Sequence, residues 1–184
     1  MTLLRTRCLT LALRVSLAGA VFVLSGCQGD VAVRPPEKQR TPYLGEPLGA
    51  FVTMNQSDAA RYFVSGIYGL EAATWRWTGR RAVLRLYLSK TDRLKFVTRF
   101  AVPAQVIARN GPIRVRILIN EKTLEELQYK KDGVYEFEQP ASAEMLKPYA
   151  ENIVTIETDK PLPSDGQGPE LGLILVHAGF RRSQ

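Results

Sequence analysis

The chain of 184 residues carries 25 Lys and Arg against 18 Asp and Glu, for a formal net charge of +7. Three of the basic residues lie in the first 26 positions. The other 22 are scattered along the chain and do not form the clustered basic patch that is typical of a nucleic-acid-binding protein. The 158 residues that follow the first 26 are enough for one domain with a real core and too few for two.

The first 26 residues have the layout of a secretory signal. Arg5 and Arg7 give a positive start, an apolar stretch interrupted by Arg14 follows, and small residues precede Cys27. The apolar window after Arg14 is about ten residues long, whereas a membrane-spanning helix needs roughly 20. We therefore expect this segment to direct export and then to be removed.

The segment that ends in Cys27, Leu-Ser-Gly-Cys, resembles the lipobox of bacterial lipoproteins. In that family the Cys sulfur receives a diacylglyceryl group and the new amino group is acylated, which implies lipid attachment at Cys27 and a permanent membrane anchor. The alternative is an ordinary secretory signal that leaves Cys27 as a thiol. We favour the lipoprotein because Cys8 leaves with the signal, so that Cys27 has no disulfide partner.

Further features of the sequence indicate the membrane in which the protein is anchored and how the folded domain is attached. Lipoproteins held at the inner membrane usually carry Asp after the Cys, and this chain has Gln28, so we expect the outer membrane, facing the periplasm. Residues 27–49 contain four prolines and little apolar periodicity, which predicts an extended tether. Residues 50–184 are predicted to form the single folded domain.

Short apolar runs with a period of two predict an all-β domain. Two packed antiparallel sheets of the jelly-roll kind suit this number of strands and the lack of a long helix. The expected strands cover residues 51–54, 61–68, 75–78, 82–88, 94–100, 113–119, 123–129, 134–137, 152–158 and 171–180.

The segments between these strands predict the connections. We expect residues 84–100 to form a hairpin or a strand that crosses between sheets, and residues 101–111 to form a loop. Two tight turns, at Asn120 and at Asp132-Gly133, predict a meander. Ser142 begins the only expected helix, of one or two turns.

Six short patterns follow one another between residues 66 and 172. They are Gly66-x-Tyr68-x-x-Glu71, Trp75-Arg76-Trp77-Thr78, Leu84-x-Leu86, Val115-x-Ile117-x-Ile119-Asn120, Asn152-x-Val154-x-Ile156, and Asp165 leading to Glu170-Leu171-Gly172. Together they resemble the galactose-binding-like β-sandwich, in the variant found as an accessory domain of bacterial glycosyltransferases. The resemblance implies a sandwich whose loops bind sugars or other polar ligands, or that serves as a packing module. The chain departs from the variant at Asn120-Glu121, where Asn-Gly is common, and at Glu170, where Arg is common.

The aromatic residues of the second pattern are candidate ligand contacts. Trp75 and Trp77 lie two apart, so a strand places both on one face, and Tyr68 could approach from the preceding strand. Such a platform could stack on a sugar ring. The alternative, which we favour from the sequence, is that both tryptophans fill the core.

Arg76 lies on the opposite face of the same strand, where Glu71 or Asp165 could pair with it. We favour a structural salt bridge over a ligand contact for this arginine. The candidate ligand set is therefore Tyr68, Glu71, Trp75, Arg76, Trp77 and Asp165. Arg114 and Arg116 are expected on a solvated outer face.

No catalytic motif accompanies these residues. His177 is the sole histidine and lies in an apolar run. It lacks the partners that a metal site or a catalytic triad needs, and no Gly-x-Ser-x-Gly motif accompanies it. We therefore expect nearby groups to meet its hydrogen bonds. A hydrolase built on Glu71, Asp165 and Glu170 is disfavoured, because acidic residues are common in loops. A calcium loop at residues 165–168 is weakly indicated, since it lacks the spaced oxygen ligands of the established motif. No cofactor is expected.

These observations predict a non-catalytic, membrane-anchored lipoprotein that binds a polysaccharide or an envelope protein. The alternative is a structural or assembly subunit that docks to a membrane enzyme of polysaccharide synthesis or export. A fold shared with sugar-binding domains does not decide between them.

Overall fold

The computed structural model describes residues 48–164, 166 and 168–183. Cys27 and Asp165 lie outside these residues, as does the predicted tether up to residue 47. Leu48 already packs in the core, ahead of the predicted domain start at residue 50. None of the helices in the described part is both long and apolar enough to cross a membrane.

The described part is built from strands, as predicted. It contains one α-helix, α1 (Ala104–Asn110), and two short 3-10 helices, η1 (Ala59–Tyr62) and η2 (Ala143–Met145). The strands are β1 (Phe51–Thr53), β2 (Phe63–Glu71), β3 (Trp75–Leu88), β4 (Leu94–Val102), β5 (Ile113–Ile119), β6 (Lys122–Tyr129), β7 (Gly133–Pro140), β8 (Ala150–Thr158) and β9 (Ile174–Arg182).

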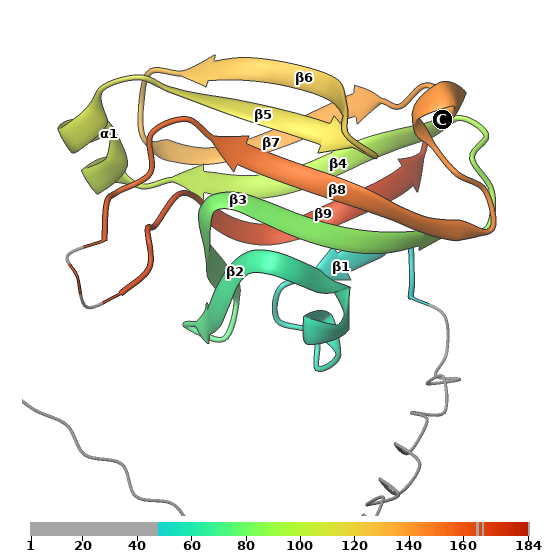
Figure 1. Ribbon diagram of the computed structural model, residues 1–184, viewed down its shortest axis with the longest axis horizontal. Helices are drawn as coiled ribbons and strands as arrows, with labels where there is room; N and C mark the ends of the chain where they lie inside the picture. Colours follow the sequence, from blue (N-terminus) through green and yellow to red (C-terminus); the bar gives the residue numbers. More distant parts are fainter. Residues whose placement is uncertain (1–47, 165, 167, 184) are drawn as a thin grey trace, which may run out of the picture. The chain divides into compact units, whose positions relative to one another are not determined.

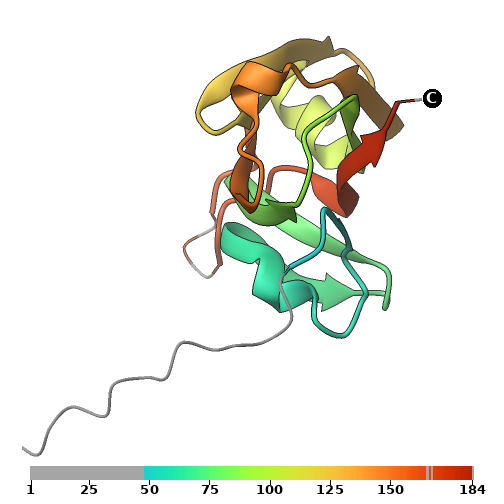
Figure 2. The ribbon, with the colours of Figure 1, turned by 90° about the vertical axis from the view of Figure 1, so that its right-hand side faces the viewer.

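The strands form two antiparallel layers with the core between them (Figures 1 and 2). One layer has the order β6-β5-β8-β3, and the other contains β3-β9-β4-β7. Outside this path, β1 pairs with β9 and β2 pairs with β3. The predicted all-β sandwich of antiparallel sheets is confirmed.

Strand β3 belongs to both layers. Its residues from Arg81 to Leu88 pair with β8, whereas Arg76 and Trp77 pair with β9. The sequence predicted two separate strands here, and the structure shows one continuous strand of 14 residues. The strand changes partners near Gly79, where a Cβ would lie 2.5 Å from the Tyr68 hydroxyl, so a larger residue here would displace the Tyr68 side chain.

The alternating patterns place the core as predicted. Every second residue of β5, from Ile113 to Ile119, is at most 2% exposed, whereas Arg114 and Arg116 between them are exposed. The run Ala82, Leu84, Leu86 and Leu88 of β3 is likewise buried. These apolar faces meet Phe96 and Phe100 of β4 and Leu175 of β9 across the sandwich.

Of the two connections predicted, one is confirmed in its second alternative and the other is wrong. Residues 84–100 do not form a hairpin but cross between the layers, because the end of β3 pairs with β8 whereas β4 pairs with β7 and β9. The predicted meander is wrong. β6 pairs with β5, but β7 crosses to the other layer, where Phe137 packs against Phe96 with ring centroids 6.4 Å apart. Phe137 is buried in this position, and the residues of the turn at 132–133 do not reveal that β7 crosses to the other layer.

The helices also differ from the prediction. The expected loop at 101–111 contains the end of β4 and helix α1, which starts after Pro103 and ends at Gly111 with φ 67°. Pro before a helix and Gly after it are the usual boundary signals. The helix expected after Ser142 is only the 3-10 turn η2, and the first two residues of the strand expected at 61–68 belong to η1.

Two asparagines tie the turn after β5 to the start of β8. Asn120 Nδ2 donates to Asn152 Oδ1 at 2.8 Å, and Asn120 Oδ1 accepts from the Ile153 amide at 3.0 Å. Asn152 is fully buried and also bonds both the amide and the carbonyl of Lys147. This network holds Asn120 and Glu121 in a left-handed turn, at φ 48° and 68°.

Asn152→Ala should lower the free energy of unfolding by about 2–3 kcal/mol, because it leaves the Asn120 amide and the Lys147 backbone groups without their buried partner. Urea unfolding followed by circular dichroism measures this loss. The control is Asn110→Ala, which removes hydrogen bonds to Lys160 and Pro161 at an exposed site and should cost less than about 1 kcal/mol. Equal losses in the two variants would contradict a structural role for the asparagine pair.

Candidate functional site

Five of the six candidate ligand residues lie on one hairpin, formed by β2 and β3. Glu71 pairs with Trp75, and the turn between them passes through Ala72 and Ala73, at φ 45° and 52°. The Thr74 amide closes the turn by donating to the Glu71 carbonyl at 3.0 Å. The structure thus places these five residues on one hairpin, and the sixth, Asp165, lies outside the described residues.

Trp75 and Trp77 form a pair at the start of β3. Their ring centroids lie 5.8 Å apart with an interplanar angle of 84°, an edge-to-face contact. Both are half-buried, and neither belongs to the cluster of core residues or to the side chains packed against it. The interpretation that we favoured from the sequence, that both fill the core, is wrong.

Arg76 has a structural role. Its Nε donates to the Met54 carbonyl at 2.9 Å, its Nη1 donates to the Tyr68 carbonyl at 3.0 Å, and its guanidinium lies 5.1 Å from the centre of the Phe63 ring. The side chain thus joins β3 to β2 and to the residue after β1. Of its two expected partners, Glu71 is not paired with it among the described residues and Asp165 lies outside them. Because backbone carbonyls use its guanidinium, Arg76 leaves the candidate ligand set.

Among the described residues no ring contact joins Tyr68 to either tryptophan, whereas Glu71 lies directly opposite Trp75 in the register of β2 and β3. The Tyr68 hydroxyl packs over Gly79. Glu71 is exposed at the end of β2. The predicted three-ring platform is therefore reduced to the two tryptophans.

The register of four strands extends the tryptophan pair into an apolar row. Trp77 of β3 pairs with Ile174 of β9, Ile174 pairs with Ala101 of β4, and Ala101 pairs with Val134 of β7. Directly paired residues of antiparallel strands project from the same face. Val134 is 60% exposed, so this is an outer face. With strands about 4.8 Å apart, the row is roughly 15 Å long.

A polar row runs beside the apolar one. Arg99 of β4 pairs in register with Glu136 of β7 and with His177 of β9. Arg99 Nε lies 3.4 Å from Glu136 Oε1, and His177 Nε2 lies 3.8 Å from Glu136 Oε2. The face therefore combines an apolar row that ends in two tryptophans with a row of hydrogen-bonding groups.

His177 presents a neutral ring to this face. Burial lowers the pKa of its imidazole, and Arg181 and Arg99 lower it further, whereas Glu136 opposes the shift. Its contact with Glu136 is therefore not an ion pair at neutral pH. The ring packs against Phe51, with centroids 5.2 Å apart. A neutral imidazole offers one donor and one acceptor.

The sequence did not place Arg99, Glu136 or His177 in a site. Alternation within β4 and β7 sets Arg99 and Glu136 opposite the buried Phe100 and Phe137, which predicts exposed polar residues and nothing more. Only the pairing of β4 with β7 and β9 brings them together.

The described residues show no metal centre of the usual kind. No group of three or more His, Cys, Asp and Glu side chains lies close enough to hold an ion in this part of the chain. Of the disfavoured carboxylate set, Glu170 pairs with Arg80 at 3.3 Å, away from Glu71 at the end of β2.

No family model matches the chain, and no curated protein matches it. Three similar solved structures illustrate what the fold resembles. A carbohydrate-binding module of the type CBM36, in complex with calcium and xylotriose, has a TM-score of 0.41 at 11% identity and covers 71% of this chain and 98% of its own. The CBM36-1 domain of a multidomain xylanase from the hindgut metagenome of Trinervitermes trinervoides has a TM-score of 0.37 at 11% identity. The match covers 56% of this chain and 72% of that domain's chain.

The third is a family GH115 4-O-methyl-α-glucuronidase with specificity for decorated arabinogalactans. Its TM-score is 0.47 at 12% identity, and the match covers 76% of this chain and 18% of the enzyme.

Trp77→Ala should lower the free energy of unfolding by only about 1 kcal/mol, because the side chain is half-buried and outside the core. Phe100→Ala, which empties a fully buried site, should cost about 3–5 kcal/mol. Urea unfolding of both variants makes the comparison. A loss for Trp77→Ala as large as that for Phe100→Ala would place the tryptophan in the core after all.

Proposed function

We propose that this protein is a non-catalytic, membrane-anchored lipoprotein whose sandwich binds a glycan on the outer face of β3, β9, β4 and β7. One observation carries the proposal: Trp75 and Trp77 form a half-exposed pair outside the core and begin an apolar row flanked by polar side chains. A sugar ring has an apolar face and a rim of hydroxyls. It therefore matches a surface that offers both kinds of contact side by side.

The polar row suits hydroxyl groups in particular. A hydroxyl both donates and accepts hydrogen bonds, and the row offers the guanidinium of Arg99 as donor, the carboxylate of Glu136 as acceptor and the neutral imidazole of His177 as either. All three side chains stand on paired strands, so their backbone is held before a ligand arrives. Because the row crosses the strands, an extended oligosaccharide would lie across them.

The membrane part of the proposal rests on the sequence. The lipobox ending in Cys27 supplies the anchor, and Gln28 favours the outer membrane with the domain facing the periplasm. A tether of about 20 residues in polyproline-like conformation would reach on the order of 60 Å. The domain would then contact glycans at a distance from the bilayer.

A second candidate is an assembly subunit that uses the same face to dock to a membrane enzyme of polysaccharide synthesis or export. The apolar row that ends at the exposed Val134 favours it, because a contiguous apolar surface is typical of protein contacts. Crosslinking in intact envelopes separates the two: a reproducible protein neighbour at residue 134 would support docking, and no consistent neighbour would exclude it.

Retention on an array of envelope and plant polysaccharides tests the glycan proposal. Trp75→Ala and Trp77→Ala should each abolish retention while the domain stays folded, because the stacking surface is removed. The matched control is Tyr149→Ala, which removes another exposed aromatic ring, 75% exposed and outside this face. Unchanged retention in both tryptophan variants would overturn the proposal, and so would retention of none of the polysaccharides by the wild-type protein.

Cys27→Ser should move the protein from the membrane fraction to the soluble periplasmic fraction, because it removes the only sulfur at the predicted lipidation position. Cell fractionation and immunoblotting measure the distribution. Cys8→Ser, within the signal segment, is the control and should leave the protein in the membrane. Continued membrane association of Cys27→Ser would contradict the anchor.

A further inference from the structure

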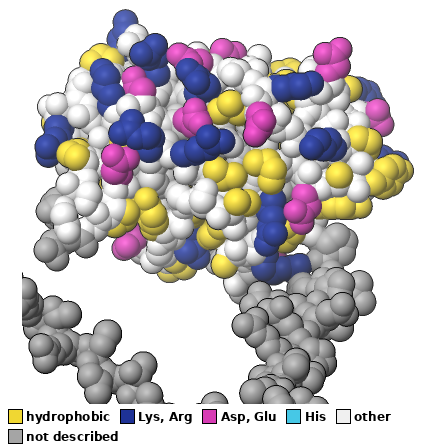
Figure 3. Space-filling view, viewed as in Figure 1, with side chains coloured by type: hydrophobic (Ala, Val, Ile, Leu, Met, Phe, Trp, Pro, Cys, Tyr) yellow, Lys and Arg dark blue, Asp and Glu magenta, His cyan; other side chains and the backbone are white. Residues whose placement is uncertain are grey.

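The outer face of the other layer, formed by β6, β5, β8 and β3, carries a groove of about 440 Å³ lined by charged side chains. Four arginines line it: Arg80, Arg81, Arg114 and Arg116. Figure 3 shows Lys and Arg interspersed with Asp and Glu over this side of the molecule. The arginines expected on a solvated surface thus belong to a hollowed site.

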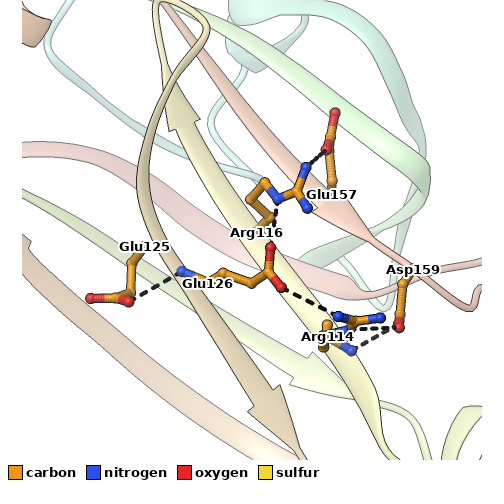
Figure 4. A network of polar contacts seen from close by, with 6 residues as sticks. All are labelled: Arg114, Arg116, Glu125, Glu126, Glu157 and Asp159. Atoms are coloured by element: carbon orange, nitrogen blue, oxygen red, sulfur yellow. Dashed lines mark hydrogen bonds and ion pairs between the residues drawn. The ribbon is translucent and has the colours of Figure 1, made fainter.

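The centre of the groove is a ladder of alternating charges across four strands. Arg116 of β5 pairs in register with Glu126 of β6 and Glu157 of β8, and Glu157 pairs with Arg81 of β3. Arg116 Nε lies 2.7 Å from Glu126 Oε2, and Arg81 Nη1 lies 3.4 Å from Glu157 Oε1 (Figure 4 shows Arg116 between the two carboxylates). Register and charge therefore hold the side chains in one network.

Each carboxylate of the groove is already occupied at both oxygens. Glu126 Oε1 lies 3.7 Å from Arg114 Nη1, opposite its contact with Arg116. Glu157 lies between Arg81 and Arg116. Asp159 accepts from the Arg114 amide at 2.8 Å with Oδ1 and from Arg114 Nε at 3.4 Å with Oδ2 (Figure 4). The acceptors of the groove are thus in use.

The donors are not used up. A guanidinium carries five N–H groups. Arg81 contacts one carboxylate through one nitrogen, and Arg114 and Arg116 each contact carboxylates through two side-chain nitrogens. The fourth arginine, Arg80, uses its side-chain nitrogens on Glu170 and on the Asp159 carbonyl, so the four arginines face four carboxylates and the cluster carries no net charge. The unused N–H donors of Arg81, Arg114 and Arg116 therefore favour a ligand that accepts several hydrogen bonds, as an oxyanion does.

The arginines are positioned to form such contacts. Each shared carboxylate lies between two arginines, Glu126 between Arg114 and Arg116 and Glu157 between Arg81 and Arg116, so the guanidinium groups stand close together in the lining. Exposed ion pairs of this kind contribute only about 0–1 kcal/mol each. An arginine can therefore exchange part of one contact for a bidentate bond to an oxyanion, which is stronger and more directional.

We propose that this groove is a second ligand site, which binds a compact oxyanion: a phosphate, sulfate or carboxylate group carried by the ligand. It lies on the outer face of the layer opposite the tryptophan pair, and it shares with that site only β3. The proposal is therefore independent of glycan binding at the tryptophans, although both groups could belong to one acidic glycan.

The test is an NMR titration of the arginine Nε–Hε signals of the purified full-length chain carrying Cys27→Ser. Inorganic phosphate, galacturonate and galactose are the probes, and the last two differ in a carboxylate against a hydroxymethyl group. Saturable shifts with phosphate or galacturonate, but not with galactose, are expected, and their relative affinities distinguish the two kinds of oxyanion. The binding should weaken with added salt.

Arg81→Gln and Arg116→Gln should each weaken binding about tenfold or more, the effect of losing one charge-assisted hydrogen bond. Arg109→Gln is the control, since Arg109 is exposed on α1 and outside the groove. Trp77→Ala should leave the titration unchanged, so that failure of one site is distinguishable from failure of the other. No saturable shift with either oxyanion, equal shifts with galactose, or an Arg109→Gln effect matching that of both groove variants would overturn the proposal.

Discussion

The structure depends on one strand that pairs with both layers. The first part of β3 completes the layer of β9 and β4, and its later part completes the layer of β8 and β5. The backbones must approach closely where the strand passes between them, and Gly79 and Gly172 permit this: a Cβ on Gly172 would lie 2.6 Å from the Gly79 carbonyl oxygen. Thr78 fixes the passage through hydrogen bonds with Leu173 in both directions.

This strand also relates the two candidate sites. Before the passage, Trp75 and Trp77 project from the outer face of one layer, and after it Arg81 projects from the outer face of the other. An aromatic surface and an arginine groove are thus held on opposite sides of one core. A single ligand chain would have to pass around the edge of the sandwich to reach both, whereas two separate ligands could be bound together.

Patterns within single strands were predictable, and partners between strands were not. Alternation in residues 113–119 identified both the buried isoleucines and the exposed Arg114 and Arg116, because a strand places successive side chains on opposite faces. The sequence could not show that Glu136, Arg99 and His177 form a row, since that depends on long-range pairing. Arg76 illustrates the same limit. Its partners are backbone carbonyls, which every residue type has, so the sequence could not identify them.

The most direct test of the central claim uses the tryptophans as reporters, since Trp75 and Trp77 are the only two in the chain. A polysaccharide that the protein retains should shift its tryptophan emission to shorter wavelength and protect it from quenching by acrylamide. Both changes follow if the ligand covers the half-exposed pair. Retention with unchanged emission and unchanged quenching would place the glycan elsewhere and contradict the assignment of this face.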